Sequence, residues 1–287
     1  MVVGVIDIGT NTTRLLVAEV EGESVQPLLQ HRHFATPAGA GARALSHLVE
    51  REAETAREAG AEVVHTVGTA SLRGSPEARR LDRACRRMGA GGLRILTEAE
   101  EARLAFAGAL AGEHGEVHGR VAVIDVGGGS TEIAAGGADG VEWWASRPVG
   151  SRRLTERALL SDPPQPSQLA AARNAVSRRF AGVEPPACDL ALAVGGGAAS
   201  LRRLCGDRLD RRTLTATLER LCAAPSAELA AELDLDARRV RLLPAALIVF
   251  EQLCELVPEP LRIARGGMRE GLALALAERA APAAEGR

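Results

Sequence analysis

Apolar runs and amphipathic stretches alternate along this chain. Continuous β-branched runs are typical of strands covered on both faces, whereas longer stretches with charged positions on one side predict helices. On this pattern we expect strands over residues 2–8, 15–20, 63–67, 94–96, 121–126, 131–135 and 190–194. We expect helices over residues 51–59, 76–88 and 98–110, and three more after residue 197, of which the last covers 269–280. Because β and α elements alternate, the sequence predicts the α/β fold class.

A connector rich in Gly and His, residues 112–119, separates the chain into two parts. The length of 287 residues is long for one ordinary domain and suits two. We therefore predict a first lobe over residues 1–116 and a second over 117–268, with the helix at about 269–281 packing back on the first lobe. The tail from Ala281 is expected to fray.

A short pattern near the start of the chain recurs in the second half. The aligned pairs are Asp7 with Asp125, Gly9 with Gly127, Thr12 with Ser130 and Thr13 with Thr131. Both copies read as an apolar strand, an Asp, a polar turn with Gly, and another apolar strand. Such a hairpin presents backbone N–H groups and hydroxyls to a phosphate, and its Gly lets the anion approach closely. Either copy alone is equally well an ordinary turn, but two copies in register favour a phosphate chain held from both sides.

Longer motifs around this repeat follow the order seen in a known family. They are Ile6-Asp7-Ile8-Gly9-Thr10-Asn11-Thr12, Thr69-Ala70-Ser71-Leu72-Arg73, Glu100-Glu101-Ala102-Arg103-Leu104, Ile124-Asp125-Val126-Gly127-Gly128-Gly129-Ser130-Thr131-Glu132, Pro148-Val149-Gly150-Ser151-Arg152-Arg153-Leu154 and Met268-Arg269-Glu270-Gly271. On these motifs the chain resembles a short form of the exopolyphosphatase and guanosine pentaphosphate phosphatase family, within the actin, sugar-kinase and heat-shock ATPase superfamily. The resemblance implies two actin-like, ribonuclease H-like lobes flanking a central cleft.

The resemblance also implies roles for individual residues in a metal-assisted hydrolysis. Glu101 would be the catalytic base or water-orienting group, and Asp7, Asp125 and Glu132 would hold Mg²⁺ or another divalent cation. The residues expected to bind phosphate are Gly9, Thr10, Asn11, Thr12, Arg73, Gly127, Gly128, Gly129, Ser130, Thr131, Gly196 and Gly197. Arg152 and Arg269 are further candidates, because Arg can bind phosphate oxygens bidentately.

Ordinary structural roles compete at two of the acidic positions. Thr97 followed by Glu100 is a capping box, which accounts for Glu100 but not for Glu101, turned about 100° around the helix. Glu132 alternates with apolar neighbours, as a solvent-facing strand residue would. The residue pattern alone leaves both roles open.

Three departures from the family pattern bear on activity and on substrate preference. Thr97-Glu98 precedes the acidic pair where the family has Ser-Gly, Ala198-Ala199 follows the three glycines where a hydroxyl is usual, and segment 31–44 is short and rich in Gly and Ala. We expect release of terminal phosphate from inorganic polyphosphate. Guanosine pentaphosphate hydrolysis, a kinase activity of the same superfamily and a non-catalytic sensor remain the alternatives.

Composition excludes several other classes of protein. Apolar residues make up 46% of the chain and charged residues 25%, which is typical of compact domains and not of disordered or membrane-embedded chains. A formal net charge of −2 provides no field to attract nucleic acid. Five widely spaced Cys, no secretory leader and no apolar membrane span indicate a cytoplasmic protein with no membrane partner. A homodimer is compatible with these features.

Overall fold

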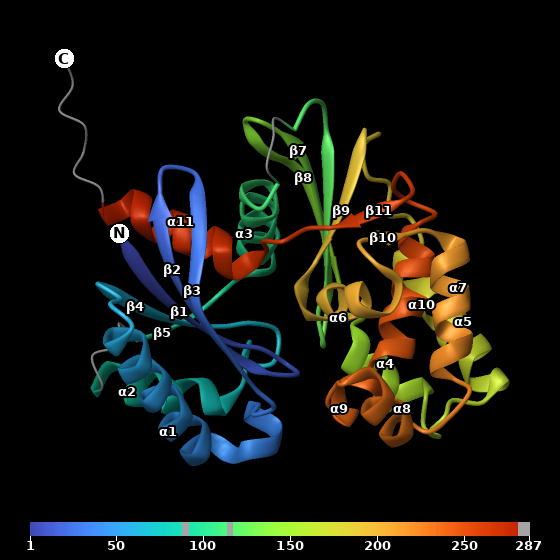
Figure 1. Cartoon of the computed structure of the whole chain (residues 1–287), viewed down its shortest axis with the longest axis horizontal. Helices are drawn as coiled ribbons and strands as arrows, with labels where there is room; N and C mark the ends of the chain where they lie inside the picture. The colour runs from blue at the N-terminus through green and yellow to red at the C-terminus, as the bar shows by residue number, and fades with distance from the viewer. Residues whose placement is uncertain (88–91, 114–116, 281–287) are drawn as a thin grey trace. The chain divides into compact units, whose positions relative to one another are not determined.

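The computed structural model describes residues 1–87, 92–113 and 117–280, without the side chains of residues 38–40 and 42. The chain forms two compact units, Met1–His114 with Gly266–Arg287, and Gly115–Arg265. The C-terminal helix α11 (Met268–Ala280) therefore belongs to the first unit (Figure 1). Each unit is built on a sheet of its own, so each has its own hydrophobic core.

The first unit contains a five-stranded sheet in the order β3-β2-β1-β4-β5. Its strands are β1 (Val2–Ile8), β2 (Thr13–Glu21), β3 (Ser24–His33), β4 (Val63–Gly68) and β5 (Leu93–Ile95). The first three form an antiparallel meander, and β4 and β5 continue the sheet in parallel with β1. Helices α1 (Pro37–Glu58) and α2 (Pro76–Arg87) cover one face, and α3 (Glu98–Ala111) and α11 cover the other (Figure 1).

Strand β1 is apolar throughout because both of its faces are covered. Ile6 and Ile8 pack in the core beneath α1 and α2, whereas Val3 and Val5 pack in the core beneath α11. Since successive side chains of a strand point to opposite faces, Asp7 lies on the face of Val3 and Val5. The sheet therefore directs this carboxylate toward the side covered by α3 and α11.

The second unit contains a six-stranded sheet in the order β10-β11-β9-β6-β7-β8. Its strands are β6 (Val121–Val126), β7 (Thr131–Gly137), β8 (Gly140–Arg147), β9 (Leu190–Val194), β10 (Arg208–Leu209) and β11 (Leu261–Ile263). Strands β6, β7 and β8 form an antiparallel meander, and β9 and β11 continue the sheet in parallel with β6. Five strands of each unit thus share one order and one set of directions, so the short repeat in the sequence belongs to a duplicated fold.

Seven helices accompany this second sheet in the described part of the unit. They are α4 (Ser151–Ala158), α5 (Pro166–Phe180), α6 (Gly195–Cys205), α7 (Arg211–Leu221), α8 (Ser226–Leu233), α9 (Ala237–Val240) and α10 (Leu243–Leu253). Nine of the eleven residues of α10 are buried, which is expected for a helix that is apolar on all sides. Helix α10 contacts α4, α5 and α7, and it forms the centre of this core.

Several expectations about the elements are corrected by the structure. Strands β3 and β8 were not predicted, because half or more of their residues are polar or exposed and give no continuous apolar run. Helix α1 begins at Pro37 and not at Arg51, so most of segment 31–44 is strand or helix. The three glycines after β9 are the first turn of α6 and not a loop, and six helices instead of three follow residue 194. Met88, the middle of the 112–119 connector and the tail from Ala281 lie outside the described residues.

Helices α3 and α11 approach each other so closely that only glycine fits at the points of contact. A Cβ atom on Gly108 would lie 1.9 Å from the carbonyl oxygen of Gly267, and one on Gly271 would lie 2.0 Å from that of Leu104. Neither Gly has room for any larger residue. This contact fixes the beginning of α11, with Arg269 and Glu270, against α3.

No helix in the described ranges combines the length and the apolar character needed to cross a lipid bilayer. All five Cys are free thiols. Burial is the main reason why the pKa of Cys254 is raised to about 12, and the pKa values of Cys85, Cys188, Cys205 and Cys222 are raised by the same cause. Cys85 and Cys254 are buried and the other three are partly buried, and raised pKa values disfavour the reactive thiolate form.

Candidate active site

The two aligned turns have the same backbone geometry. The N–H of Gly9 donates to the carbonyl oxygen of Thr12, and the N–H of Gly127 donates to that of Ser130. Both N···O distances are 3.0 Å. A Cβ atom on Gly9 would lie 3.2 Å from the Thr12 oxygen, and one on Gly127 would lie 3.0 Å from the Ser130 oxygen. The backbone geometry of the two turns confirms the hairpin duplication predicted from the sequence.

A Thr directly after each turn fastens the hairpin to a later segment. The hydroxyl of Thr13 donates to the carbonyl oxygen of Ala35 over 2.7 Å, and that of Thr131 donates to Val149 over 2.6 Å. Both side chains are fully buried. Thr131 was predicted to bind phosphate, but its hydroxyl is enclosed and already donates its proton, so its role in this structure is to hold the turn in place.

In the first unit, Asp7 lies at the end of β1 among oppositely charged side chains. It pairs in register with Arg14 of β2. Its Oδ1 atom is buried without a hydrogen-bond partner. Burial raises the pKa of Asp7, and this effect outweighs the attraction of the Arg269 and Arg14 guanidinium groups, which lowers it. Glu270 raises the pKa further. A carboxylate in this state is a ready ligand for a cation or a proton.

Glu101 and Glu100 have separate partners at the start of α3. Glu100 completes the predicted capping box, since its backbone N–H donates to Thr97 Oγ1 over 3.2 Å and its carboxylate accepts from the Thr97 N–H over 2.8 Å. Glu101 instead forms an ion pair with Arg73. The same guanidinium donates to the carbonyl oxygen of Leu96 over 3.0 Å. The structure therefore pairs Arg73, which was predicted to bind phosphate, with the predicted catalytic carboxylate.

In the second unit, Asp125 is the penultimate residue of β6 and lies beside the first turn of α6. Gly195 has φ +85°, and a Cβ atom there would lie only 2.2 Å from Asp125 Oδ1. Gly196 and Gly197 follow within the same helical turn. The backbone N–H groups of a first helical turn lack intrahelical partners and favour anions. These glycines thus bring the N-terminus of α6 next to the Asp125 carboxylate.

Glu132 is opposite Asp125 in the pairing of β6 with β7. Its side chain is buried, which argues against the solvent-facing alternative. Ser146 of β8 donates its hydroxyl to Glu132 Oε1 over 2.9 Å. Because β8 was not predicted, sequence reasoning missed Ser146. The position equivalent to Glu132 in the first unit is occupied by Arg14, so one turn is bordered by an acid and the other by a base.

The segment around Gly150 packs directly on the second glycine turn. A Cβ atom on Gly150 would lie 2.6 Å from the carbonyl carbon of Gly128. The N–H of Ser151 donates to Gly127 over 2.9 Å, and that of Arg153 donates to Gly128 over 3.0 Å. This contact explains why the Pro148 to Leu154 motif accompanies the turn, since it holds the turn's backbone in place.

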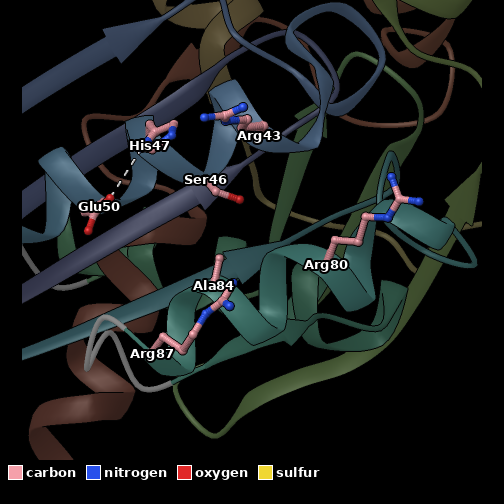
Figure 2. Close-up of a pocket in the computed structure, with 7 residues that line it drawn as sticks. All are labelled: Arg43, Ser46, His47, Glu50, Arg80, Ala84 and Arg87. Atoms are coloured by element: carbon pink, nitrogen blue, oxygen red, sulfur yellow. Dashed lines mark ion pairs between the residues drawn. The ribbon is translucent and has the colours of Figure 1, made fainter.

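The predicted residues therefore form one set in each unit. Asp7, the turn from Gly9 to Thr12, and the Arg73–Glu101 pair belong to the first unit. Asp125, Glu132, the second glycine turn and the beginning of α6 belong to the second. A hollow of about 480 Å³ beside α1 and α2 has none of these residues in its wall; Arg43, Ser46, His47, Glu50, Arg80, Ala84 and Arg87 line it (Figure 2).

Two α/β units of one topology, each with an Asp at the end of its first strand and a glycine turn after it, define a protein of the actin-like class. The model of the Ppx/GppA phosphatase family matches residues 40–280. The chain belongs to this family and is therefore a phosphatase, an enzyme of the hydrolase class.

Individual relatives agree with this assignment. The chain is 28% identical over 304 aligned positions to Exopolyphosphatase 1 of Mycobacterium tuberculosis, covering 96% of this chain and 88% of the relative. It is 34% identical over 197 positions to Exopolyphosphatase 2 of the same species, covering 62% and 61%. Among solved structures, a Ppx/GppA family member from Aquifex aeolicus superimposes with a TM-score of 0.82 at 21% identity, covering 99% of both chains. This last similarity establishes the fold.

Proposed function

We propose that this phosphatase releases terminal orthophosphate from inorganic polyphosphate. The observation that carries the proposal is the duplicated glycine turn, with matching Gly9 and Gly127 geometry and a carboxylate at the preceding strand end. Such turns suit the closely spaced, identical anionic groups of a phosphate chain. The names of the mycobacterial relatives support polyphosphate as the substrate.

Backbone groups are the main phosphate ligands in this proposal. The turns from Gly9 to Thr12 and from Gly127 to Ser130 present N–H groups and hydroxyls, and Gly196 and Gly197 present N–H groups at the start of α6. Backbone donors recognise phosphate oxygens without reading a base or sugar. A substrate built only of phosphate groups fits this donor set.

The carboxylates fit a divalent metal of the Mg²⁺ type. Asp7 has a buried oxygen without a hydrogen-bond partner, and Asp125 near the end of β6 lies opposite Glu132 near the start of β7. Mg²⁺ prefers such oxygen ligands and is held by few carboxylates together with substrate phosphates. When bound, it supplies neutralisation of the charge on the phosphoryl group. Asp7 in the first unit, and Asp125 with Glu132 in the second, are the residues that we propose as metal ligands.

Glu101 orients the attacking water and accepts its proton. The water oxygen forms a bond to the terminal phosphorus, and the bond from that phosphorus to the bridging oxygen breaks. The leaving oxygen remains on the shortened chain, and orthophosphate is released. Arg73 acts as a positioning residue in this scheme, because its ion pair with Glu101 and its bond to Leu96 fix the carboxylate.

Phosphate release tests the proposal directly. Purified enzyme with Mg²⁺ is given polyphosphate or guanosine pentaphosphate, and orthophosphate is measured over time. We expect release from polyphosphate at the higher kcat/KM, and at least about a hundredfold loss in kcat for Glu101→Gln. Glu100→Gln is the matched control, because Glu100 serves the helix cap. A preference for guanosine pentaphosphate would refute the substrate assignment, and release from neither would remove the hydrolysis proposal.

A further inference from the structure

Two His and a buried Glu converge in the first unit, away from the residues discussed above. His31 and His33 belong to β3, and Glu52 belongs to α1. His31 Nδ1 lies 2.8 Å from Glu52 Oε2, and His33 Nε2 lies 3.0 Å from Glu52 Oε1. One ligand atom from each residue lies within 4.8 Å of the other two. The three side chains thus present two nitrogens and a carboxylate to one point.

The fold brings these residues together through strand alternation. His31 and His33 are two positions apart, so their side chains point to the same face of the sheet. The register places His31 opposite Leu15 of β2. Leu15 packs in the core with Leu45 and Ala53 of α1, which identifies that face as the one covered by α1. Asp7 lies on the opposite face, so the cluster is separate from the predicted Mg²⁺ ligands.

The cluster contains a carboxylate and a ring nitrogen that the protein itself does not satisfy well. The Glu52 side chain is only 5% exposed, whereas those of His31 and His33 are 37% and 32% exposed. A carboxylate so buried requires a positive partner. His33 Nε2 is shut off from solvent and makes no hydrogen bond, although it lies beside Glu52 Oε1. A cation bound to both atoms would satisfy the nitrogen lone pair and the carboxylate charge together.

We propose that His31, His33 and Glu52 bind a divalent transition metal ion, with Zn²⁺ as the best match. Two imidazoles and one carboxylate form a known zinc donor set, which leaves a fourth position for water. Ligand atoms around a tetrahedral Zn²⁺ lie roughly 3.4 Å apart, and the three ligand atoms here lie within 4.8 Å of one another, so side-chain adjustment brings them to the ion. Mg²⁺ disfavours imidazole nitrogen, which separates this site chemically from the carboxylates at Asp7 and Asp125. The bound ion cross-links β3 to α1.

Metal binding by the full-length protein tests this inference without reference to catalysis. Chelator-treated protein is titrated with Zn²⁺ in a calorimeter, in two buffers that differ in ionisation enthalpy. We expect one tightly bound Zn²⁺ per chain, with proton release on binding, and a higher Tm in its presence. Substitution of Co²⁺ should give the visible absorption of a four-coordinate ion.

The variants His33→Ala and Glu52→Gln should each weaken Zn²⁺ binding by at least about a hundredfold. His47→Ala is the matched control, because His47 also lies on α1 beside a carboxylate, Glu50, but is 66% exposed and faces the hollow in Figure 2. Equal affinity in all three variants would overturn the proposal. Where a variant does not fold by circular dichroism, the wild-type protein decides: no Zn²⁺ uptake and no Co²⁺ spectrum identify a plain His–Glu ion-pair cluster.

Discussion

Substitution of Gly195 by Ala should displace the Asp125 carboxylate, and so lower kcat, more than it lowers the stability of the second unit. The added Cβ atom would lie 2.2 Å from Asp125 Oδ1, and contacts below 3.0 Å essentially do not occur. The carboxylate oxygen must therefore move by at least about 0.8 Å. Asp is short and can rotate away, so we expect the collision itself to cost little stability. A displacement of about 1 Å in a reacting group can nevertheless cost about a hundredfold in rate.

The backbone penalty of this substitution has a matched control at the other end of the same helix. Gly206 follows α6 with φ +79°, close to the +85° of Gly195, but a Cβ atom there would meet nothing within 4 Å. Both Ala variants should lose about 1–3 kcal/mol of unfolding free energy, because both place a Cβ atom at positive φ. Only Gly195→Ala should lose about a hundredfold in kcat.

Urea unfolding curves give the free energy of unfolding, and phosphate release gives kcat, each measured well below the Tm of the variant. The reasoning fails if Gly195→Ala retains the kcat of Gly206→Ala per folded molecule. It also fails if only the KM of Gly195→Ala changes, since that would place Asp125 outside the chemical step.

Three further perturbations follow from the first unit. Gly108→Ala should lower the free energy of unfolding by about 3 kcal/mol, despite its helix-propensity gain of roughly 1 kcal/mol, because the new methyl group collides with the α11 backbone; an unchanged urea midpoint would contradict the close contact. Because burial raises the pKa of Asp7, its charge costs stability once the pH rises above the unfolded-state value of about 3.9. Asp7→Asn should therefore stabilise the protein at pH 7 and by progressively less toward pH 3, as urea titrations at both pH values would reveal. Arg73→Ala should lower kcat about tenfold to a hundredfold with little change in KM, and Arg73→Lys should recover part of it; a rise in KM alone would instead identify Arg73 as a phosphate ligand.

Much of the fold could be predicted because its signals are local. Continuous apolar strands such as β1 and β6 and the glycine turns after them depend on neighbouring residues only. The alignment of the two copies was therefore sufficient to find two equivalent hairpins, but it did not reveal that the Thr13 and Thr131 hydroxyls are buried behind the turns. The capping box at Thr97 is equally local, and it was predicted correctly.

The remaining features depend on contacts between distant segments. The first turn of α6 consists of three glycines, which are poor helix formers, so tertiary packing and not propensity makes it helical. The pairing of Arg73 with Glu101 joins the turn after β4 to the start of α3, and no sequence pattern in either segment predicts this ion pair. The His31-x-His33 spacing was a visible signal, but its third member, Glu52, becomes apparent only when α1 covers β3.

The return of α11 to the first unit has a consequence for biosynthesis. During translation the whole of Gly115–Arg265 emerges before α11 does, so the second unit can complete its core while the first still waits for its final helix. Until then Val3, Val5 and Leu16 lack the cover that Leu272 and Leu276 provide. We expect nascent chains halted before residue 268 to expose an apolar sheet face and to engage chaperones, and the emergence and docking of α11 to end that interval.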